Sequence, residues 1–537
     1  MLRFDSAIYP YPSRRNVLYA KNGMVATGSP LAAQAGLEIL KKGGNAIDAA
    51  IATAAALTVV EPTSNGIGGD AFAIFSIKNK IYGLNASGPS PKLLEAQKLW
   101  DKGLKTMPQY GLIPVNVPGI PKAWAELSGK FGRLPLTEVL APAVKLAREG
   151  FPVAVNVGKL WKNAVPEFKK QLEKAEEFRY WFETFAPDGK APEIGDIVRF
   201  PDHGDTLEKI GESKSDAFYK GELAEKTDAF FRKYDGYLRK EDLEAYEVQW
   251  VEPITTNYHG YDVYEIPPNG HGISVLMALN ILEPWYFEAR ETIRAYHVMI
   301  EAMKLAFADA QRYVTDPRFM RVCPEDLLSK AYAEERRKLI GEKAILPEPG
   351  DPVTGGTVYL AAADNEGNMI SYIQSNYCGF GSGIVVPGTG ISLHDRGLNF
   401  SLDPASPNCA GPSKKPYHTI IPGFLAKDGN PVGPFGVMGG FMQPQGHVQV
   451  LTNTIDFLMN PQAALDAPRW QWIGQKTVEL EHGVGEHIAY GLAAAGHDVK
   501  VVHDSLAMGR GEIIWKMENG VYAAGAEPRT DGHIALY

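Results

Sequence analysis

The sequence predicts an α+β fold, because helical and β-rich stretches occupy different parts of the chain. Small and apolar residues recur at helical spacing over 30–40 and again over 46–60. The region from about 120 to 345 is also predicted to be mostly helical. β-Branched and apolar residues over 357–363 and 369–376 indicate a hairpin, and the chain after it is β-rich.

The two N-terminal helices begin and end at clear signals. The glycine pair 43–44 terminates the first helix, and Asn45 is placed to cap the second. Residues 46–60 are alanine-rich on every side, which predicts a helix buried between layers. A glycine-rich loop, 61–70, then leads into a strand over Ala71–Ile77. This loop lacks both a preceding strand and a lysine in P-loop register, so a structural loop is favoured over a phosphate site.

The rest of the chain supplies scaffold helices and connecting loops. Amphipathic runs such as 142–149 and 296–307 predict helices, and further helices are expected over 442–458 and 486–496. The segment 347–356, PEPGDPVTGG, is the most loop-like stretch. A length of 537 residues suggests about three or four domains, although a large sandwich can form a single unit.

The composition excludes several classes of protein. Lys and Arg number 54 and Asp and Glu 63, a net charge of −9, and no cationic run is present to bind nucleic-acid phosphates. The most apolar stretch, 49–60, is too short to span a membrane, and the N-terminal residues lack the apolar core of a secretory signal. Three scattered cysteines fit a reducing compartment. We therefore expect a soluble, cytoplasmic protein without a nucleic-acid or membrane partner.

Thr357 is the candidate nucleophile. It opens a predicted strand after two glycines, which leave room for its hydroxyl to attack the preceding carbonyl. Once cleaved, it would carry a free α-amine that titrates at about 7.7 to 8.0 and can act as the general base. The alternative is that this threonine only favours a strand. Histidines do not cluster with Cys or carboxylates at ligand spacing, so we expect no metal and no cofactor.

Ordered motifs along the chain support this interpretation of Thr357. They are GMVATGSPLAAQAGLEILKKGGNAIDAAIATAAALTVVEPTSNGIGGDAFAIF, PVNVPGIPKAWAEL, GRLPLTEVLAPAVKLAREGF, EDLEAYEVQWVEP, TVYLAAADNEGNMISYIQSNY and GVMGGFMQPQGH. Together they resemble the γ-glutamyltransferase (glutathione hydrolase) family over residues 20–535. The resemblance implies an N-terminal nucleophile hydrolase, whose α+β fold is a four-layer αββα sandwich.

The resemblance also implies how the chain matures. It aligns Thr357 with the family's nucleophile, the first residue of the small subunit. Self-cleavage between Gly356 and Thr357 would then give a large subunit, 1–356, and a small subunit, 357–537. Both subunits would belong to one αββα domain.

Three further residues align with the family's catalytic machinery. Gly439 and Gly440 match the glycines whose N–H groups form the oxyanion hole, although a plain β-turn is the alternative. Ser375, on the second strand of the hairpin, matches a hydroxyl residue beside the nucleophile. We therefore expect these residues to surround Thr357.

The substrate-binding positions depart from the family pattern. The arginine that clamps the glutamyl α-carboxylate in the family aligns here with Ser87. The acidic residue that holds the glutamyl amine aligns with Asn399, the pair of serines with His418 and Thr419, and the hairpin asparagine with Tyr377. Recognition of a glutamyl group is therefore expected to be weakened.

Arg396 is a compensating feature. It lies where the family usually has a neutral residue close to the glutamyl pocket, and a guanidinium there can bind a carboxylate. The alternative is a surface arginine paired with Asp395 or Glu366. His418 has two interpretations as well, since a buried histidine can line the pocket or fill a polar core site.

We expect an autoprocessing amidohydrolase or acyltransferase that cleaves γ-glutamyl-like or glutaryl-like amides through an acyl-threonine. The loop 399–416 is shorter than the lid of many transferases of the family, which favours hydrolysis. The motifs GLNASGPSP, QSNY, HDRG and KPYHTIIPG resemble the branch that includes cephalosporin acylases. A genuine γ-glutamyltransferase and a non-maturing binding protein are the alternatives. The expected partners are a small-molecule amide or γ-glutamyl peptide and the chain's own subunits, with a homodimer or larger assembly left open.

Overall fold

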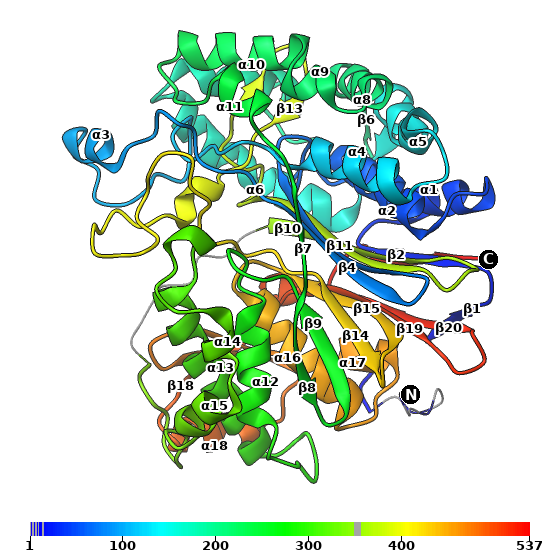
Figure 1. Ribbon diagram of the computed structural model, residues 1–537, viewed down its shortest axis with the longest axis vertical. Coiled ribbons are helices and arrows are strands. Elements are labelled where there is room, and N and C mark those ends of the chain that lie inside the picture. Colours follow the sequence, from blue (N-terminus) through cyan, green and yellow to red (C-terminus); the bar gives the residue numbers. More distant parts are fainter. Residues whose placement is uncertain (1, 3–4, 6–7, 9, 13–14, 348–355) are drawn as a thin grey trace.

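The computed structural model describes residues 2, 5, 8, 10–12, 15–347 and 356–537. Two seven-stranded sheets pack face to face between two helical layers (Figure 1). One sheet has the order β21-β2-β10-β11-β3-β4-β7 and the other β1-β20-β19-β15-β14-β9-β8. This arrangement confirms the predicted four-layer αββα sandwich.

The first sheet combines strands from both sides of Thr357. Its strands are β21 (His533–Leu536), β2 (Met24–Thr27), β10 (Gly356–Ala363), β11 (Met369–Tyr377), β3 (Asp70–Ile77), β4 (Lys80–Ala86) and β7 (Gln249–Val251). The hairpin β10–β11 is the predicted one, with Ala363 paired to Met369. β2 pairs with the other edge of β10, so the strand that begins at the candidate nucleophile is held on both sides.

The helices α1 (Pro30–Lys41) and α2 (Ala46–Val60) pack on the outer face of this sheet, and α5 (Leu136–Glu149) packs on α2 (Figure 1). Asn45 caps α2 as predicted, in a reciprocal capping box with Asp48. Every residue of α2 is buried, which confirms that the helix lies between layers.

The second sheet is also drawn from both sides of Thr357. Its strands are β1 (Leu18–Ala20), β20 (Tyr522–Ala526), β19 (Arg510–Lys516), β15 (Asn430–Met438), β14 (Gly423–Lys427), β9 (Tyr261–Glu265) and β8 (Ile254–Tyr258). Its outer face packs on α12 (Ile273–Leu282), α16 (Met442–Ile455) and α17 (Pro461–Asp466), and α13 (Ile293–Tyr313) packs on α12. Apolar side chains from both sheets fill the space between them, including Phe72, Tyr359, Phe424 and Ile514. The predicted subunits 1–356 and 357–537 therefore contribute to both sheets.

The middle region is mostly helical, as predicted. Its remaining helices are α4 (Ile120–Phe131), α6 (Val155–Leu172), α7 (Arg179–Phe185), α8 (Pro201–Ser213), α9 (Asp216–Tyr219), α10 (Glu222–Lys233), α11 (Lys240–Glu244), α14 (Pro324–Leu327) and α15 (Lys330–Arg337). The prediction overlooked β7 and the β8–β9 hairpin. ITTNY and YDVYE alternate in polarity around a two-residue turn, a short strand signal that the neighbouring amphipathic runs mask.

Smaller elements complete the chain. They are α3 (Ala96–Asp101), β5 (Phe151–Pro152) with β6 (Ile197–Val198), β12 (Val385–Val386) with β13 (Ile391–Ser392), and β16 (Trp470–Gly474), β17 (Thr477–Glu481) and β18 (Asp498–Val502) with α18 (Glu486–Ala494). The predicted loop 347–356 falls outside the described residues except at its two ends. Within the described parts of the chain, we find no helix with the length and apolar character required to cross a bilayer.

Candidate active site

Thr357 lies at the start of β10 with its side chain fully buried. The register between β10 and β11 shifts here: Gly356 pairs with Tyr377, but Val358 pairs with Gln374. Such irregularities re-aim a side chain out of the regular pleat. The Thr357 hydroxyl donates a hydrogen bond to Ser375 Oγ at 3.1 Å. The structure thus brings together two hydroxyls that the sequence analysis associated.

Gly439 and Gly440 form the turn between β15 and α16. Their φ angles of 132° and 59° lie in the left-handed region, which favours glycine at both positions. The Gly439 carbonyl accepts from Met442 N–H at 3.0 Å and the Gly440 carbonyl from Gln443 N–H at 3.2 Å. Neither glycine's own N–H donates to a backbone carbonyl within the described residues. Both donors are therefore available, at the start of a helix whose dipole favours negative charge.

Contacts and short stretches of chain run from the helix after this turn to Thr357. Gln443, in the first turn of α16, accepts from Ile421 N–H at 2.9 Å. Two residues earlier, the Thr419 hydroxyl accepts from Arg396 Nη1 at 2.6 Å. The Arg396 guanidinium lies 4.6 Å from the centroid of the Tyr377 ring, and Tyr377 N–H donates to Ser375 Oγ at 2.7 Å. Thr357, Ser375, Tyr377 and Arg396 are therefore connected by contacts, while the oxyanion role of Gly439 and Gly440 stays a prediction.

Arg396 is fully buried at the start of a 3₁₀ turn, Arg396–Asn399. The alternative of a surface arginine is wrong, because Glu366 pairs on the surface with Arg133 instead. Arg396 Nε and Nη2 have no hydrogen-bond partner among the described residues. Buried polar groups normally have partners, so these two donor nitrogens distinguish Arg396 from an ordinary structural arginine.

Two neighbours of Arg396 also carry buried polar atoms that lack a partner within the described chain: Asp395 Oδ2 and the Tyr377 hydroxyl. Asp395 Oδ1 accepts from Cys378 N–H at 3.0 Å. Burial raises the pKa of Asp395 to about 7, against the opposing effect of the Cys378 hydrogen bonds and the Arg396 charge. The surroundings of Arg396 therefore combine donor nitrogens, a carboxylate oxygen and a hydroxyl.

Asp70 is a member of this site that the sequence analysis did not single out. It pairs in register with Ser375 across β3 and β11, and its Oδ2 lies 3.0 Å from His418 Nε2. Burial raises the Asp70 pKa to about 7, against the lowering effect of Arg396. The available signal was an aspartate at the end of a glycine-rich loop, directly before a strand.

His418 and His394 both lie beside Asp70. His418 is fully buried and packs on the Phe72 ring, with the centroids 4.8 Å apart, while His394 Nε2 is 3.9 Å from Asp70 Oδ1. Burial lowers the pKa of both imidazoles, that of His394 to about 3, so both are neutral at physiological pH. His418 is therefore a polar core histidine beside Asp70, and its lining of a substrate pocket stays a prediction.

Ser87 and Asn399 are less directly involved. The Ser87 hydroxyl donates to Asn85 Oδ1 at 2.7 Å, and Asn85 donates to Asn269, whose carbonyl accepts from His418 N–H. Ser87 thus supports the backbone of the site. The Asn399 carbonyl accepts from Asn408 Nδ2 at 2.6 Å. No hydrogen bond among the described residues joins the side chain of Ser87 or Asn399 to Thr357 or Arg396.

The fold gathers one His/Glu cluster that sequence spacing did not reveal. His297, Glu301 and His497 place ligand atoms within 4.8 Å of one another, which corrects the expectation that histidines stay apart from carboxylates. His297 Nδ1 lies 2.9 Å from His497 Nε2. The Lys304 ammonium donates to Glu301 at 2.6 Å and lies 3.4 Å from His497 Nδ1. This lysine already supplies the cluster with a positive charge, so we assign no metal to it.

Comparisons with known proteins agree with this geometry. The model of the Gamma-glutamyltranspeptidase family matches residues 32–537. A crystal structure of cephalosporin acylase from Bacillus halodurans superposes with a TM-score of 0.95 and 58% identity, covering 99% of each chain. The glutathione hydrolase-like YwrD proenzyme of Bacillus subtilis is 37% identical over 95% of this chain and 97% of its own. The acylase ACY 1 proenzyme of Pseudomonas sp. strain SE83 is 32% identical over 95% and 92%.

These matches cover nearly the whole chain, and the sandwich fold agrees with them. The chain therefore belongs to the gamma-glutamyltranspeptidase family, as an autoprocessing N-terminal nucleophile amidohydrolase of the glutathione hydrolase and acylase type.

Proposed function

We propose that this protein hydrolyses amides whose acyl group ends in a carboxylate, through an acyl-Thr357 intermediate. The observation that carries the proposal is the Arg396 guanidinium. It is fully buried, two of its nitrogens have no partner among the described residues, and it is two contacts away from Ser375, which adjoins Thr357. A buried cation with open donors is a recognition site for an anionic group.

The proposed reaction has two acyl-transfer steps. After cleavage before Thr357, its α-amine takes the hydroxyl proton while Oγ1 attacks the amide carbonyl. The N–H groups of Gly439 and Gly440 stabilise the oxyanion, and the amine passes the proton to the leaving group. Water then attacks the acyl-threonine and releases the acid. Ser375, 3.1 Å from the nucleophile, orients the Thr357 hydroxyl.

A glutaryl-like acyl group is the substrate we favour. The family's arginine clamp for an α-carboxylate is replaced by Ser87, which is committed to Asn85, so we assign the carboxylate to Arg396, a buried cation with unpartnered donor nitrogens. The 58% identical Bacillus halodurans chain is a cephalosporin acylase, which also favours an acylase reaction. The short loop 399–416 favours water over a second acceptor.

A γ-glutamyl group is the second candidate. Asp395 Oδ2 is buried next to Arg396 and has no partner among the described residues, so it can accept a hydrogen bond from a substrate ammonium. A γ-glutamyl substrate differs from a glutaryl one only by its α-amino group. The two candidates therefore predict opposite effects of this α-amino group on kcat/KM.

The test compares glutaryl-p-nitroanilide with γ-glutamyl-p-nitroanilide on the mature enzyme. We expect kcat/KM to be at least about tenfold higher for the glutaryl substrate, which corresponds to about 1.4 kcal/mol. A preference of that size for the γ-glutamyl substrate would establish the second candidate instead. The control variant is Arg133→Gln, which removes an exposed arginine paired with Glu366. Its kcat/KM for both substrates should stay unchanged. Turnover of neither substrate by cleaved enzyme would overturn both candidates.

A further inference from the structure

We infer that Arg469 is a positioning residue that holds the Gly439–Gly440 turn in its reactive geometry. The inference rests on the proposed oxyanion role of that turn. Arg469 lies just before β16 and does not touch Thr357 in any described contact. It acts through the segment 508–509, which packs directly behind the turn.

Gly509 is the direct support of the turn. A Cβ built on Gly439 would lie 3.2 Å from Gly509 Cα, so the two backbones are in contact. From the other side, a Cβ on Gly509 would come within 2.7 Å of Val437 Cγ1 and 3.0 Å of Met442 Cγ. Gly509 therefore fits between the end of β15 and the start of α16, and any movement of it is transmitted to the turn between them.

The Arg469 side chain holds Gly509 in place by binding the backbone carbonyls of Met508 and Gly509. Its Nη1 donates to Met508 O at 3.0 Å and to Gly509 O at 2.7 Å. Its Nη2 donates to Glu527 Oε2 at 2.7 Å, and the same carboxylate oxygen accepts from Gly511 N–H at 2.8 Å. One planar guanidinium thus connects the buried Glu527 carboxylate to the backbone on both sides of Arg510. A flexible lysine ammonium cannot reproduce this set of hydrogen bonds.

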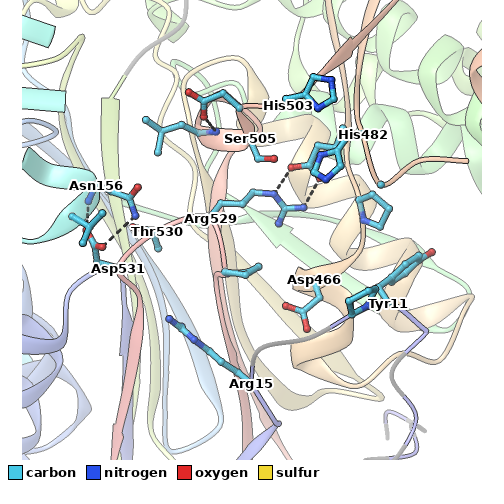
Figure 2. Close-up of a pocket in the computed structure, with 18 of the residues that line it drawn as sticks. Tyr11, Arg15, Asn156, Asp466, His482, His503, Ser505, Arg529, Thr530 and Asp531 are labelled. Carbon is cyan, nitrogen blue, oxygen red and sulfur yellow. Dashed lines mark hydrogen bonds and ion pairs between the residues drawn. The ribbon is translucent and has the colours of Figure 1, made fainter. Parts of the chain in front are cut away.

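A second arginine completes the network. Arg529 donates to Glu527 Oε1 at 2.7 Å and forms a two-point ion pair with Glu481. Glu481 in turn accepts from Arg469 N–H at 2.7 Å, so two arginines and two glutamates form a closed ring. Figure 2 shows Arg529 at the wall of a cavity of about 730 Å³, also lined by His482 and His503. All three nitrogens of the Arg529 guanidinium donate hydrogen bonds within the protein. We therefore assign Arg529 to the network of arginines and glutamates, and not to a ligand in the cavity.

The decisive measurement is steady-state hydrolysis of glutaryl-p-nitroanilide by Arg469→Lys, with kcat normalised to the cleaved fraction measured by denatured mass spectrometry. We expect kcat to fall about 10²-fold, the cost of losing one oxyanion donor, while KM changes less than about threefold. Arg337→Lys is the matched control. Arg337 also binds two backbone carbonyls, Ile281 O and Asn280 O at 2.8 Å each, but on α12, and its kcat should stay unchanged.

Gly509→Ala tests the same contact without altering Arg469. Its Cβ meets the clashes described above at a φ of 77°, so it should also lower kcat while sparing KM. If folded and cleaved Arg469→Lys retains wild-type kcat, or if kcat falls only in proportion to lost folded protein, Arg469 has no positioning role. If Arg469→Lys fails to fold, normal kcat in Gly509→Ala overturns the inference. Activity retained by Thr357→Ala would instead refute the proposed nucleophile, which is a separate result.

Discussion

Two buried arginines in the same sandwich have opposite surroundings. Arg469 is 2% exposed, and its guanidinium donates to Glu527 and to the backbone carbonyls of Met508 and Gly509. Arg396 is 0% exposed, yet only its Nη1 has a described partner, Thr419. Burial disfavours the charge of both arginines, but Arg469 has more hydrogen bonds within the protein to offset that cost than Arg396 has.

The difference in hydrogen-bond partners separates a structural arginine from one that we assign to substrate binding. A buried arginine whose two terminal nitrogens are both hydrogen-bonded holds backbone segments in place, as Arg469 does for 508–509. A buried arginine with open donors is costly to the fold, so we assign its remaining donors to a substrate. The two aspartates near Arg396 fit this assignment, because their raised pKa values allow them to stay partly protonated and leave the arginine its charge.

The largest expected effect is that of Thr357→Ala, since the proposed roles of both arginines depend on a functional nucleophile. This change removes the hydroxyl, so the chain should stay uncut as one species of 58.7 kDa with no measurable hydrolysis. Thr357→Ser keeps a hydroxyl and should be cleaved. At 58.7 kDa for 537 residues, about 0.109 kDa per residue, its fragments should weigh about 39 and 20 kDa. Two fragments from Thr357→Ala would refute the assignment.

The next effect is on stability and contrasts the two arginines directly. Arg469→Ala removes one of the two arginines that bind the buried Glu527 carboxylate, while Arg529 stays, and should lower the free energy of unfolding by about 1.5 to 3 kcal/mol. Arg396→Ala should lower it by about 1 kcal/mol or less, because Asp70 and Asp395 can take up protons. Urea unfolding of both variants, in the uncut Thr357→Ala background, gives the comparison. Equal losses would show that Arg396 is as structural as Arg469.

A smaller effect concerns substrate affinity. Arg396→Gln keeps polar contacts but removes the positive charge, so KM for glutaryl-p-nitroanilide should rise about 10- to 100-fold, with a smaller change in kcat. The KM for valeryl-p-nitroanilide, which lacks the terminal carboxylate, serves as the control and should hardly change. An unchanged KM for the glutaryl substrate would mean that the open donors of Arg396 do not bind its carboxylate.

The smallest effect is a pH dependence of the same KM. Asp70 and Asp395, with pKa values near 7, are mostly protonated below that pH and ionise as the pH rises through it. Their negative charges then compensate Arg396, and Lys415, whose pKa burial lowers to about 8, loses its own charge. His394 and His418 are neutral throughout this pH range, so they add no positive charge to the site. We expect KM for the glutaryl substrate to rise about three- to tenfold between pH 6 and 8, and KM for the valeryl substrate to stay flat.

Local patterns were sufficient for the elements that carry the chemistry. The helix capped by Asn45 and the hairpin from 357 to 377 depend on near neighbours, and both formed within a residue or two of their predicted bounds. The motifs around Thr357 and Gly439–Gly440 led to the family, which the comparisons confirm. The β8–β9 hairpin was overlooked because its alternation is brief and lies between strong helical runs.

What the sequence determined by itself was the α+β class, the family and the identity of the candidate nucleophile, because those depend on ordered local motifs. Only the tertiary structure decided that Arg396 is buried with open donors, that Asp70 meets His418 across 348 positions, and that Arg469 binds Glu527 across 58. Burial and pairing over such separations depend on how the two sheets stack. No local pattern contains that information, since the cost of burying a charge is set by whatever the fold places beside it.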